Sequence, residues 1–263
     1  MNSRMKRAPH WLIFPLGLIL TLTGCLTQPT EPPPSPTDSP APTASPIPTA
    51  TIDWFPASPT PEETLIPQAT PTPEFFPALG ALLLTDDFSD PSVWALPTGT
   101  LASAALDLNQ LTIVLNDPRA YLAATRTDLY LTDYYLEVTA RTSLCAGLDE
   151  YGVLLRAASP ADFYRFSLSC DGQFRLDRIR GGTASSPVAW TFSSAVPQNP
   201  PASVKIGVWV TGDEMHLYLN DQYQLTANTP LIPGGTIGFF ARSAGENAVT
   251  VNFSGLTVWE VLP

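Results

Sequence analysis

Six side chains in this sequence combine flat rings, forked donors and a carboxylate, which is the chemistry of a sugar-binding surface. Aromatic faces stack on the C–H patches of sugars, and guanidinium groups and carboxylates exchange hydrogen bonds with hydroxyls. Successive side chains of a β-strand point to opposite faces, so residues two apart share one face. This alternation predicts an outward-facing candidate ligand-binding set: Arg156, Arg165, Arg175, Asp177, Trp209 and Tyr218.

The same set also has a purely structural interpretation. Outward rings and charge pairs stabilise neighbouring strands, and Arg175 with Asp177 fits a solvated charge ladder equally well. Alternation does not say whether these strands belong to one sheet. Arg156 is the weakest member, because it shares parity with the apolar Leu154.

Catalytic residues are not evident. Ser–His–Asp chemistry needs a positioned histidine base. His216, the one histidine after the first ten residues, stands in an alternating run that predicts a surface strand residue, and no G-x-S-x-G motif is present. Glycoside hydrolysis needs two carboxylates about 5–10 Å apart. The acids of the predicted strands stand alone in their runs (Glu137, Asp177 and Glu260), and those in predicted turns, such as Asp149-Glu150, read as solvated groups or local caps. We therefore predict a non-catalytic protein.

Strands must position these side chains, because short alternating runs follow one another with hardly a helical stretch. Turn pairs such as Asp171-Gly172, Gly181-Gly182 and Asn220-Asp221 separate the runs. This pattern predicts an all-β domain, an antiparallel jelly-roll β-sandwich of roughly a dozen strands. The predicted strands are residues 111–115, 135–141, 152–157, 163–170, 174–179, 204–210, 215–219, 237–241 and 249–261.

Several of these segments resemble concanavalin A-like lectin/glucanase (laminin G-like) domains. The segments are LTDDFSD at 84–90 with Trp94, GVLLR at 152–156, FYRF at 163–166, GQFRL at 172–176, EMHLYLND at 214–221, GTIGF at 235–239 and VNFSGLTV at 251–258. The resemblance covers nearly all of residues 78–263. It implies the fold more than an activity, because the family includes lectins, carbohydrate-binding modules, hydrolases and adhesion modules. It also implies a possible structural calcium near Asp86 or Asp87; no other cofactor is expected.

Two cysteines lie in the predicted domain. Cys145 follows one predicted strand and Cys170 ends another, 25 residues later. An exported domain permits oxidation, so we predict a disulfide between them. Two cysteines and one histidine make a zinc site improbable.

The N-terminus carries export signals. Arg4, Lys6 and Arg7 precede an apolar run at residues 11–22, which is shorter than the ~20 residues of a spanning helix and typical of a signal peptide. Leu22-Thr23-Gly24-Cys25 then resembles the lipobox of bacterial lipoproteins. The resemblance implies cleavage after Gly24, lipid attachment at Cys25 and a signal peptide at residues 1–24. We expect the protein to be extracytoplasmic and lipid-anchored to the cell membrane or cell surface.

Residues 25–77 form a Pro/Thr/Ser-rich linker that holds 16 of the 29 prolines. Proline fixes φ and removes backbone donors, so the segment is predicted to be a disordered, extended spacer. At ~3.1 Å per residue it reaches at most about 150 Å from the anchor. An apolar interruption at residues 52–55 (IDWF) reads either as a docking patch or as a solvated island.

The net charge of the predicted domain limits the classes of partner that it can bind. Residues 78–263 contain 10 basic and 18 acidic residues, a net charge of −8, which argues against nucleic acid. Besides the membrane, the predicted partner is a glycan or polysaccharide. Two alternatives stay open: a glycoside hydrolase-like enzyme, which requires facing carboxylates in a cleft, and a protein-binding adhesion or envelope module, which requires a flat apolar patch. The pattern does not define the oligomeric state or the ligand.

Overall fold

The computed structural model describes residues 78–229 and 232–262. The predicted signal peptide, the lipid-attachment residue Cys25 and the linker lie outside the described residues. Among the described residues the single helical element is a 3-10 turn, η1 (Pro91–Val93). No helix in this part of the chain is long and apolar enough to span a bilayer. All other regular elements are strands, so the all-β prediction is confirmed.

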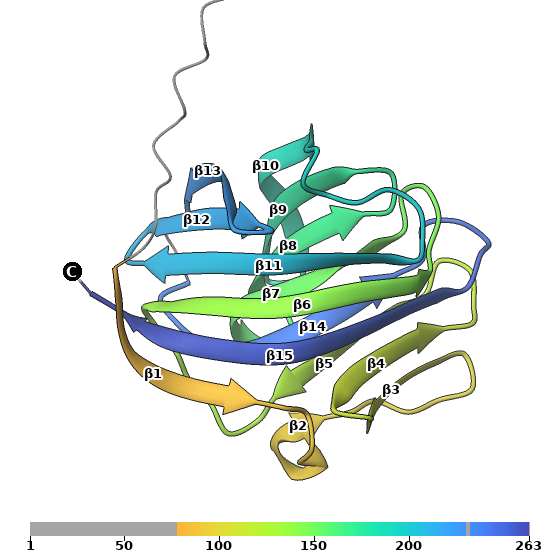
Figure 1. The fold of residues 1–263 in the computed structure, drawn as a ribbon, viewed down its shortest axis with the longest axis horizontal. Coiled ribbons are helices and arrows are strands. Elements are labelled where there is room, and N and C mark those ends of the chain that lie inside the picture. The colour runs from red at the N-terminus through yellow and green to blue at the C-terminus, as the bar shows by residue number, and fades with distance from the viewer. Residues whose placement is uncertain (1–77, 230–231, 263) are drawn as a thin grey trace, which may run out of the picture. The chain divides into compact units, whose positions relative to one another are not determined.

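Two antiparallel sheets form two layers (Figure 1). The first sheet has the order β13-β12-β11-β6-β15-β4-β3, and β1 pairs with the later part of β15. Its strands are β1 (Leu79–Asp86), β3 (Ala102–Asp107), β4 (Gln110–Leu115), β6 (Tyr134–Leu144), β11 (Ala202–Thr211), β12 (Glu214–Leu219), β13 (Gln222–Asn228) and β15 (Val249–Val261).

The second sheet lies behind the first in Figure 1 and has the order β10-β9-β8-β7-β14-β5-β2. Its strands are β2 (Trp94–Ala95), β5 (Tyr121–Arg126), β7 (Glu150–Ser159), β8 (Asp162–Ser169), β9 (Gln173–Arg180), β10 (Thr183–Phe192) and β14 (Thr236–Arg242). Hairpins of consecutive strands form part of each sheet, and long-range pairs such as β6-β15 and β7-β14 join them, which is the interleaving expected of a jelly-roll sandwich.

The core lies between the two sheets, where the inward half of each alternating strand is buried. In β8, Tyr164, Phe166 and Leu168 are fully buried, and in β11 the valines and Ile206 take the same role. The predicted inward residues of β9, Phe174 and Leu176, also join this cluster. Burying such side chains stabilises the sandwich by ~25 cal/mol per Å² of apolar area removed from water.

The disulfide prediction is also confirmed. Cys145, just after β6, is bonded to Cys170, just after β8, with the two Cα atoms 6.0 Å apart. Because β6 belongs to the first sheet and β8 to the second, the bond ties the two layers together. An oxidised pair of this kind is consistent with an extracytoplasmic location.

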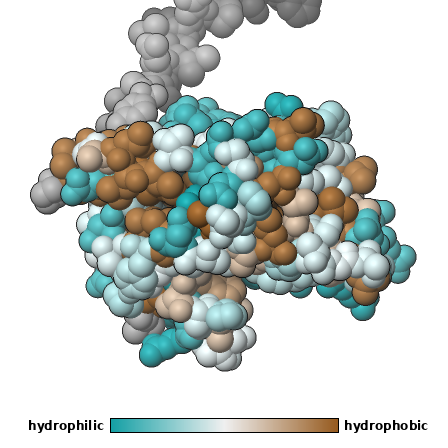
Figure 2. Space-filling view, turned by 90° about the horizontal axis from the view of Figure 1, so that it is seen from below, coloured by the Kyte–Doolittle hydropathy of each residue, from teal (hydrophilic) through white to brown (hydrophobic). Residues whose placement is uncertain are grey.

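Strand β1 lies at an edge of the first sheet and leaves apolar side chains exposed. Its pairing with β15 has two register shifts, so the leucine run does not alternate cleanly between the core and solvent. Figure 2 shows apolar side chains gathered on this side of the domain, at the left of the view. Leu82 is 56% exposed, and Leu79, Leu83 and Leu262 are exposed as well.

Candidate functional site

The outer face of the second sheet, which points away from the core, carries three of the six predicted ligand-binding residues. Arg165 lies on β8, and Arg175 and Asp177 lie on β9. Their predicted outward orientation is confirmed, because Phe166, Phe174 and Leu176, at the alternate positions, lie in the core. The register pairs Arg165 with Asp177 across the two strands.

Five charged side chains form an ion-pair ladder across four neighbouring strands of this face, β9, β8, β7 and β14. Asp177 Oδ2 lies 2.7 Å from Arg165 Nη2 and 3.1 Å from Arg175 Nη2. The same Arg175 nitrogen lies 3.1 Å from Glu150 Oε2, and Arg242 Nη1 lies 2.6 Å from Glu150 Oε1. Asp177 is 1% exposed and Glu150 is 2% exposed, so two buried carboxylates are balanced by three guanidinium groups.

The ladder leaves buried donors that it does not use. Ser167 lies on β8 between Gly152 of β7 and Arg175 of β9. Ser167 Oγ, Arg165 Nε and Arg175 Nε are buried and have no hydrogen-bond partner among the described residues. Buried polar groups are nearly always hydrogen-bonded, so unpaired donors on one face are a reason to look for a ligand or water there. We call the ladder together with Ser167 the polar floor.

Aromatic rings flank the polar floor. The half-buried Trp190 of β10 packs against Arg175, whose Cζ lies 4.4 Å from the ring centroid. On the other side, Arg165 Cζ lies 5.4 Å from the centroid of Phe240, and Tyr121 stacks on that same ring. Burial raises the pKa of the Tyr121 phenol, and the positive charge of Arg165 opposes the rise.

An apolar pocket of about 460 Å³ opens on the same face, beside the polar floor. Tyr121, Leu154 and Phe163 form its walls together with small residues of β5, β7 and the β7–β8 turn. Another hollow, of about 490 Å³, lies at the β3–β4 hairpin and is lined by none of the predicted site residues. The full lining of the apolar pocket is Ala95, Pro97, Tyr121, Ala123, Thr125, Leu154, Ala157, Ala158, Ser159, Pro160, Phe163 and Thr236.

The expectation that Arg156 faces outward with this set is wrong. Arg156 is 2% exposed, and its guanidinium donates to three backbone carbonyls: those of Thr132 (2.7 Å from Nη2), Gly212 (2.7 Å from Nη1) and Ile232 (3.2 Å from Nη1). Its φ of 46° breaks the strand alternation, and the pairing of β7 shifts register there. Leu154 belongs to an apolar cluster on the outer face, so counting by twos from it would place Arg156 on that face as well. The positive φ turns the Arg156 side chain away from that face instead.

Trp209 and Tyr218 do not share a surface with the arginines. They lie on β11 and β12 of the first sheet, and their neighbours Val208, Val210 and Leu217 are in the core, so they face away from the second sheet. The sequence left open whether the six residues share one sheet, and the structure divides them between two. Ligand binding by Trp209 or Tyr218 stays a prediction for a separate surface.

That second surface is an aromatic face that crosses four strands, β12, β11, β6 and β15. Tyr218 contacts Tyr135 at 6.0 Å between ring centroids, and Tyr135 contacts Trp259 at 5.7 Å. His216 lies 4.2 Å from Trp209 and is 7% exposed, so it points outward as predicted but is buried among rings instead of lying at the surface. Burial raises the pKa of Tyr218 to about 12.

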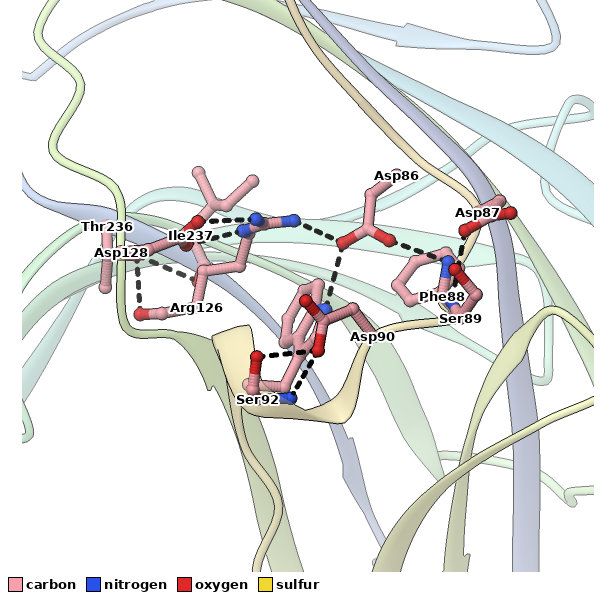
Figure 3. Close-up of polar contacts among 11 residues, drawn as sticks. Asp86, Asp87, Phe88, Ser89, Asp90, Ser92, Arg126, Asp128, Thr236 and Ile237 are labelled. Atoms are coloured by element: carbon pink, nitrogen blue, oxygen red, sulfur yellow. Dashed lines mark hydrogen bonds and ion pairs between the residues drawn. The ribbon is translucent and has the colours of Figure 1, made fainter.

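The residues considered for calcium have other contacts. Figure 3 shows Asp86 paired with Arg126, which also holds Asp128 through two hydrogen bonds of 2.8 and 2.9 Å. Asp86 Oδ2 also accepts from Trp94 Nε1 at 2.9 Å, and Trp94 lies in the core. Asp87 accepts from the backbone of Ser89. Within the described residues no group of three or more His, Cys, Asp or Glu side chains is arranged to hold a metal ion.

Sequence reasoning missed Glu150, which it placed in a turn with Asp149. Asp149 is a local cap, since its carboxylate accepts from the backbone of Ala146 and Ala244. Glu150, however, is the first residue of β7 and shares the outward parity of Gly152 and Leu154. Extending the alternation of β7 two residues backward would have found it.

No family model matches the chain, and no curated protein matches it. Solved structures do. A carbohydrate-binding module, CBM66 from Bacillus subtilis, is 15% identical, with a TM-score of 0.53 over 64% of this chain and 96% of its own. A Bacillus subtilis protein of unknown function with a galectin-like fold is 16% identical, with a TM-score of 0.53 over 71% and 99%.

A third similar structure is the catalytic domain of an endo-1,3-β-glucanase (laminarinase) from Thermotoga petrophila. It is 11% identical to this chain, with a TM-score of 0.52 over 72% of this chain and 100% of its own. At these identities the similarity concerns the fold. The described domain has the concanavalin A-like lectin/glucanase β-sandwich fold.

Proposed function

We propose that this domain is a non-catalytic glycan-binding module, displayed outside the cytoplasm by a lipid on Cys25 and the proline-rich segment that follows it. The polar floor carries this proposal. A sugar hydroxyl both donates and accepts hydrogen bonds, and the floor offers guanidinium donors and carboxylate acceptors side by side, with donors still unpaired. Trp190 adds a flat ring at the edge of the floor.

The fold supports a carbohydrate ligand but does not select one. Two of the similar structures are described as a carbohydrate-binding module and a β-glucanase, and a shared fold alone does not transfer either activity. The location on a sheet face beside a pocket of about 460 Å³ agrees with the usual size and shape of small-molecule sites.

A comparison of the two sheet faces tests the proposal. The full chain, reconstituted in lipid nanodiscs, is screened on a broad glycan array, and the dissociation constant of the best ligand is then measured for variants. Arg175→Met and Trp190→Ala should weaken binding about tenfold or more, which corresponds to ~1.4 kcal/mol each. Trp209→Ala, on the opposite face, discriminates between the two surfaces and should bind as the unaltered protein does if the glycan lies on the polar floor. An array without ligands would contradict the proposal, and a loss confined to Trp209→Ala or equal in it would contradict the assignment of the ligand to the polar floor.

The anchor has its own test. Cells that express the full chain should incorporate labelled palmitate into it, and the Cys25→Ala variant should not. If the Cys25→Ala variant stays labelled and membrane-bound, the lipid is not on this residue.

Glycoside hydrolysis is the first alternative, and Glu150 with Asp177 is the pair that favours it. Both carboxylates lie 3.1 Å from one nitrogen of Arg175, so the two facing oxygens are separated by at most twice that distance, a limit that admits the spacing of a retaining pair. Yet all four carboxylate oxygens accept from arginine or serine. Release of reducing sugar by the full chain, abolished in Glu150→Gln, would establish the enzyme.

Protein binding is the second alternative, and the exposed leucines of β1 favour it. Leu79, Leu82, Leu83 and Leu262 form an exposed apolar cluster at a sheet edge, a feature that often marks interaction surfaces. A partner captured by the full chain but not by Leu82→Glu, with glycan binding unchanged, would support this function.

A further inference from the structure

We infer that the sugar ligand of this face carries an apolar substituent, such as an alkyl, acyl or aryl group, which enters the apolar pocket while the sugar lies on the polar floor. This inference rests on the proposed glycan-binding function and names the chemical class of the ligand.

The pocket and the polar floor are continuous. On β8, Phe163 lines the pocket, and Arg165, two residues later on the same face, belongs to the floor. On β7, Leu154 lines the pocket, and Glu150 of the floor lies four residues earlier. Two strand residues span roughly 7 Å, so a sugar ring bound on the polar floor would reach the edge of the apolar pocket.

One ring also joins the two regions. Phe240 packs with Leu154 and Phe163 in a small apolar cluster on this outer face. Tyr121, which lines the pocket, stacks on the Phe240 ring, and Arg165, which belongs to the polar floor, contacts the same ring. A ligand that touches both sides of this ring would contact a hydrogen-bonding surface at one end and an apolar wall at the other.

The lining of the pocket does not suit a bare sugar. None of its residues is charged, and its polar side chains are four hydroxyl groups, those of Tyr121, Thr125, Ser159 and Thr236. Sugar hydroxyls buried there without partners would lose hydrogen bonds to water. Each buried CH₂ group, in contrast, strengthens binding roughly fourfold.

Two glycosides of each sugar, which differ only in the length of the alkyl group, test this inference on the unaltered protein. Methyl and butyl glycosides of glucose, galactose, mannose, fructose and glucuronic acid are titrated against the full chain in lipid nanodiscs, with matching empty nanodiscs to subtract partitioning into lipid. For the sugar that binds, the butyl glycoside should bind at least about tenfold more tightly than the methyl glycoside. Equal affinities would overturn the inference and leave the glycan-binding function standing. Failure of every glycoside to bind would overturn both.

Variants then locate the effect. Ala123→Glu places a charge in the pocket and should reduce the butyl advantage, which is the ratio of the two affinities, to about twofold or less. Ala105→Glu makes the same change in the hollow at the β3–β4 hairpin of the other sheet and should keep the full advantage. If Ala123→Glu retains the advantage, the alkyl group binds elsewhere and the inference is wrong. Far-UV circular dichroism of both variants checks that they are folded.

Discussion

Glu150 and Asp177 lie on strands that are not neighbours, yet a single guanidinium nitrogen of Arg175 contacts both carboxylates at 3.1 Å. Strand β8 separates β7 from β9, and Arg175 reaches past it to Glu150. The ladder thus connects four strands into one electrostatic unit. The two carboxylates share Arg175, whereas Arg165 pairs with Asp177 alone and Arg242 with Glu150 alone.

Because of this shared partner, Glu150→Gln and Asp177→Asn should have non-additive effects on the free energy of unfolding. Each single variant should cost about 1–3 kcal/mol, because guanidinium groups lose a charged acceptor. The double variant should differ from the sum by at least ~0.5 kcal/mol. Chemical denaturation of the unaltered protein, the two single variants and the double variant measures this coupling energy. When all four proteins also carry Arg175→Met, the coupling energy should vanish.

The pair Asp177→Asn and Glu137→Gln is the control for that cycle. Glu137 lies on β6 of the first sheet, where it pairs with Lys205 instead of the ladder. These two effects should add. Additivity of Glu150→Gln with Asp177→Asn as well would mean that Arg175 does not couple the carboxylates.

Arg156 is expected to stabilise the fold without contributing to ligand binding. Its guanidinium donates hydrogen bonds to backbone carbonyls in three separate loops, those between β5 and β6, β11 and β12, and β13 and β14. Arg156→Lys cannot reproduce this fork, so it should destabilise the domain by more than ~2 kcal/mol while glycan affinity at low temperature stays unchanged. A tenfold loss of affinity in a folded Arg156→Lys protein would show that it belongs to the site after all.

The Cys145–Cys170 bond should contribute about 3 kcal/mol, because it closes a loop of 25 residues and restricts the unfolded chain. The double variant Cys145→Ser/Cys170→Ser should therefore unfold at lower denaturant concentration. Reductant should shift the unaltered protein toward this midpoint and leave the double variant unmoved. A reductant effect of equal size in both proteins would assign it to another cause.

The Asp128 carboxylate should add stability only above acidic pH. Hydrogen bonds from the Arg126 guanidinium lower the pKa of Asp128 below its usual value of 3.8. A group whose pKa is depressed by folding stabilises the native state above its unfolded pKa, and this contribution is lost as pH falls through the folded pKa. Asp128 is half exposed, so solvent screening keeps the contribution below ~1 kcal/mol.

Asp128→Asn should therefore be slightly less stable than the unaltered protein at pH 7, and the gap should close below about pH 4. Added salt should also reduce the gap, because the pair is partly screened. Denaturation curves at pH 7, 4 and 3 give the comparison. A gap that widens on acidification would reverse the predicted sign.

The sequence alone determined the class of the fold and the inward and outward faces of individual strands. The alternation in β8, β9 and β11 requires Phe166, Leu176 and Val208 to be buried, because each strand has one face against the core. It was also sufficient to pair Cys145 with Cys170, since the domain holds two cysteines. The alternation did not extend to β7 at Arg156, where a positive φ interrupts the period of two.

Only the tertiary structure decided which outward residues meet. Strand alternation is a local property, whereas membership in a sheet depends on pairing between segments far apart in the chain. Arg165 and Trp209 have the same outward pattern, yet β8 and β11 belong to different sheets whose outer faces point in opposite directions. The same long-range pairing brings Glu150 beside Arg175 and Arg242 and places an apolar pocket next to the charges. Side-chain periodicity predicted nine of the strands and missed β1, β2, β3, β5, β10 and β13. The site depends on the order in which the chain assembles the strands into sheets.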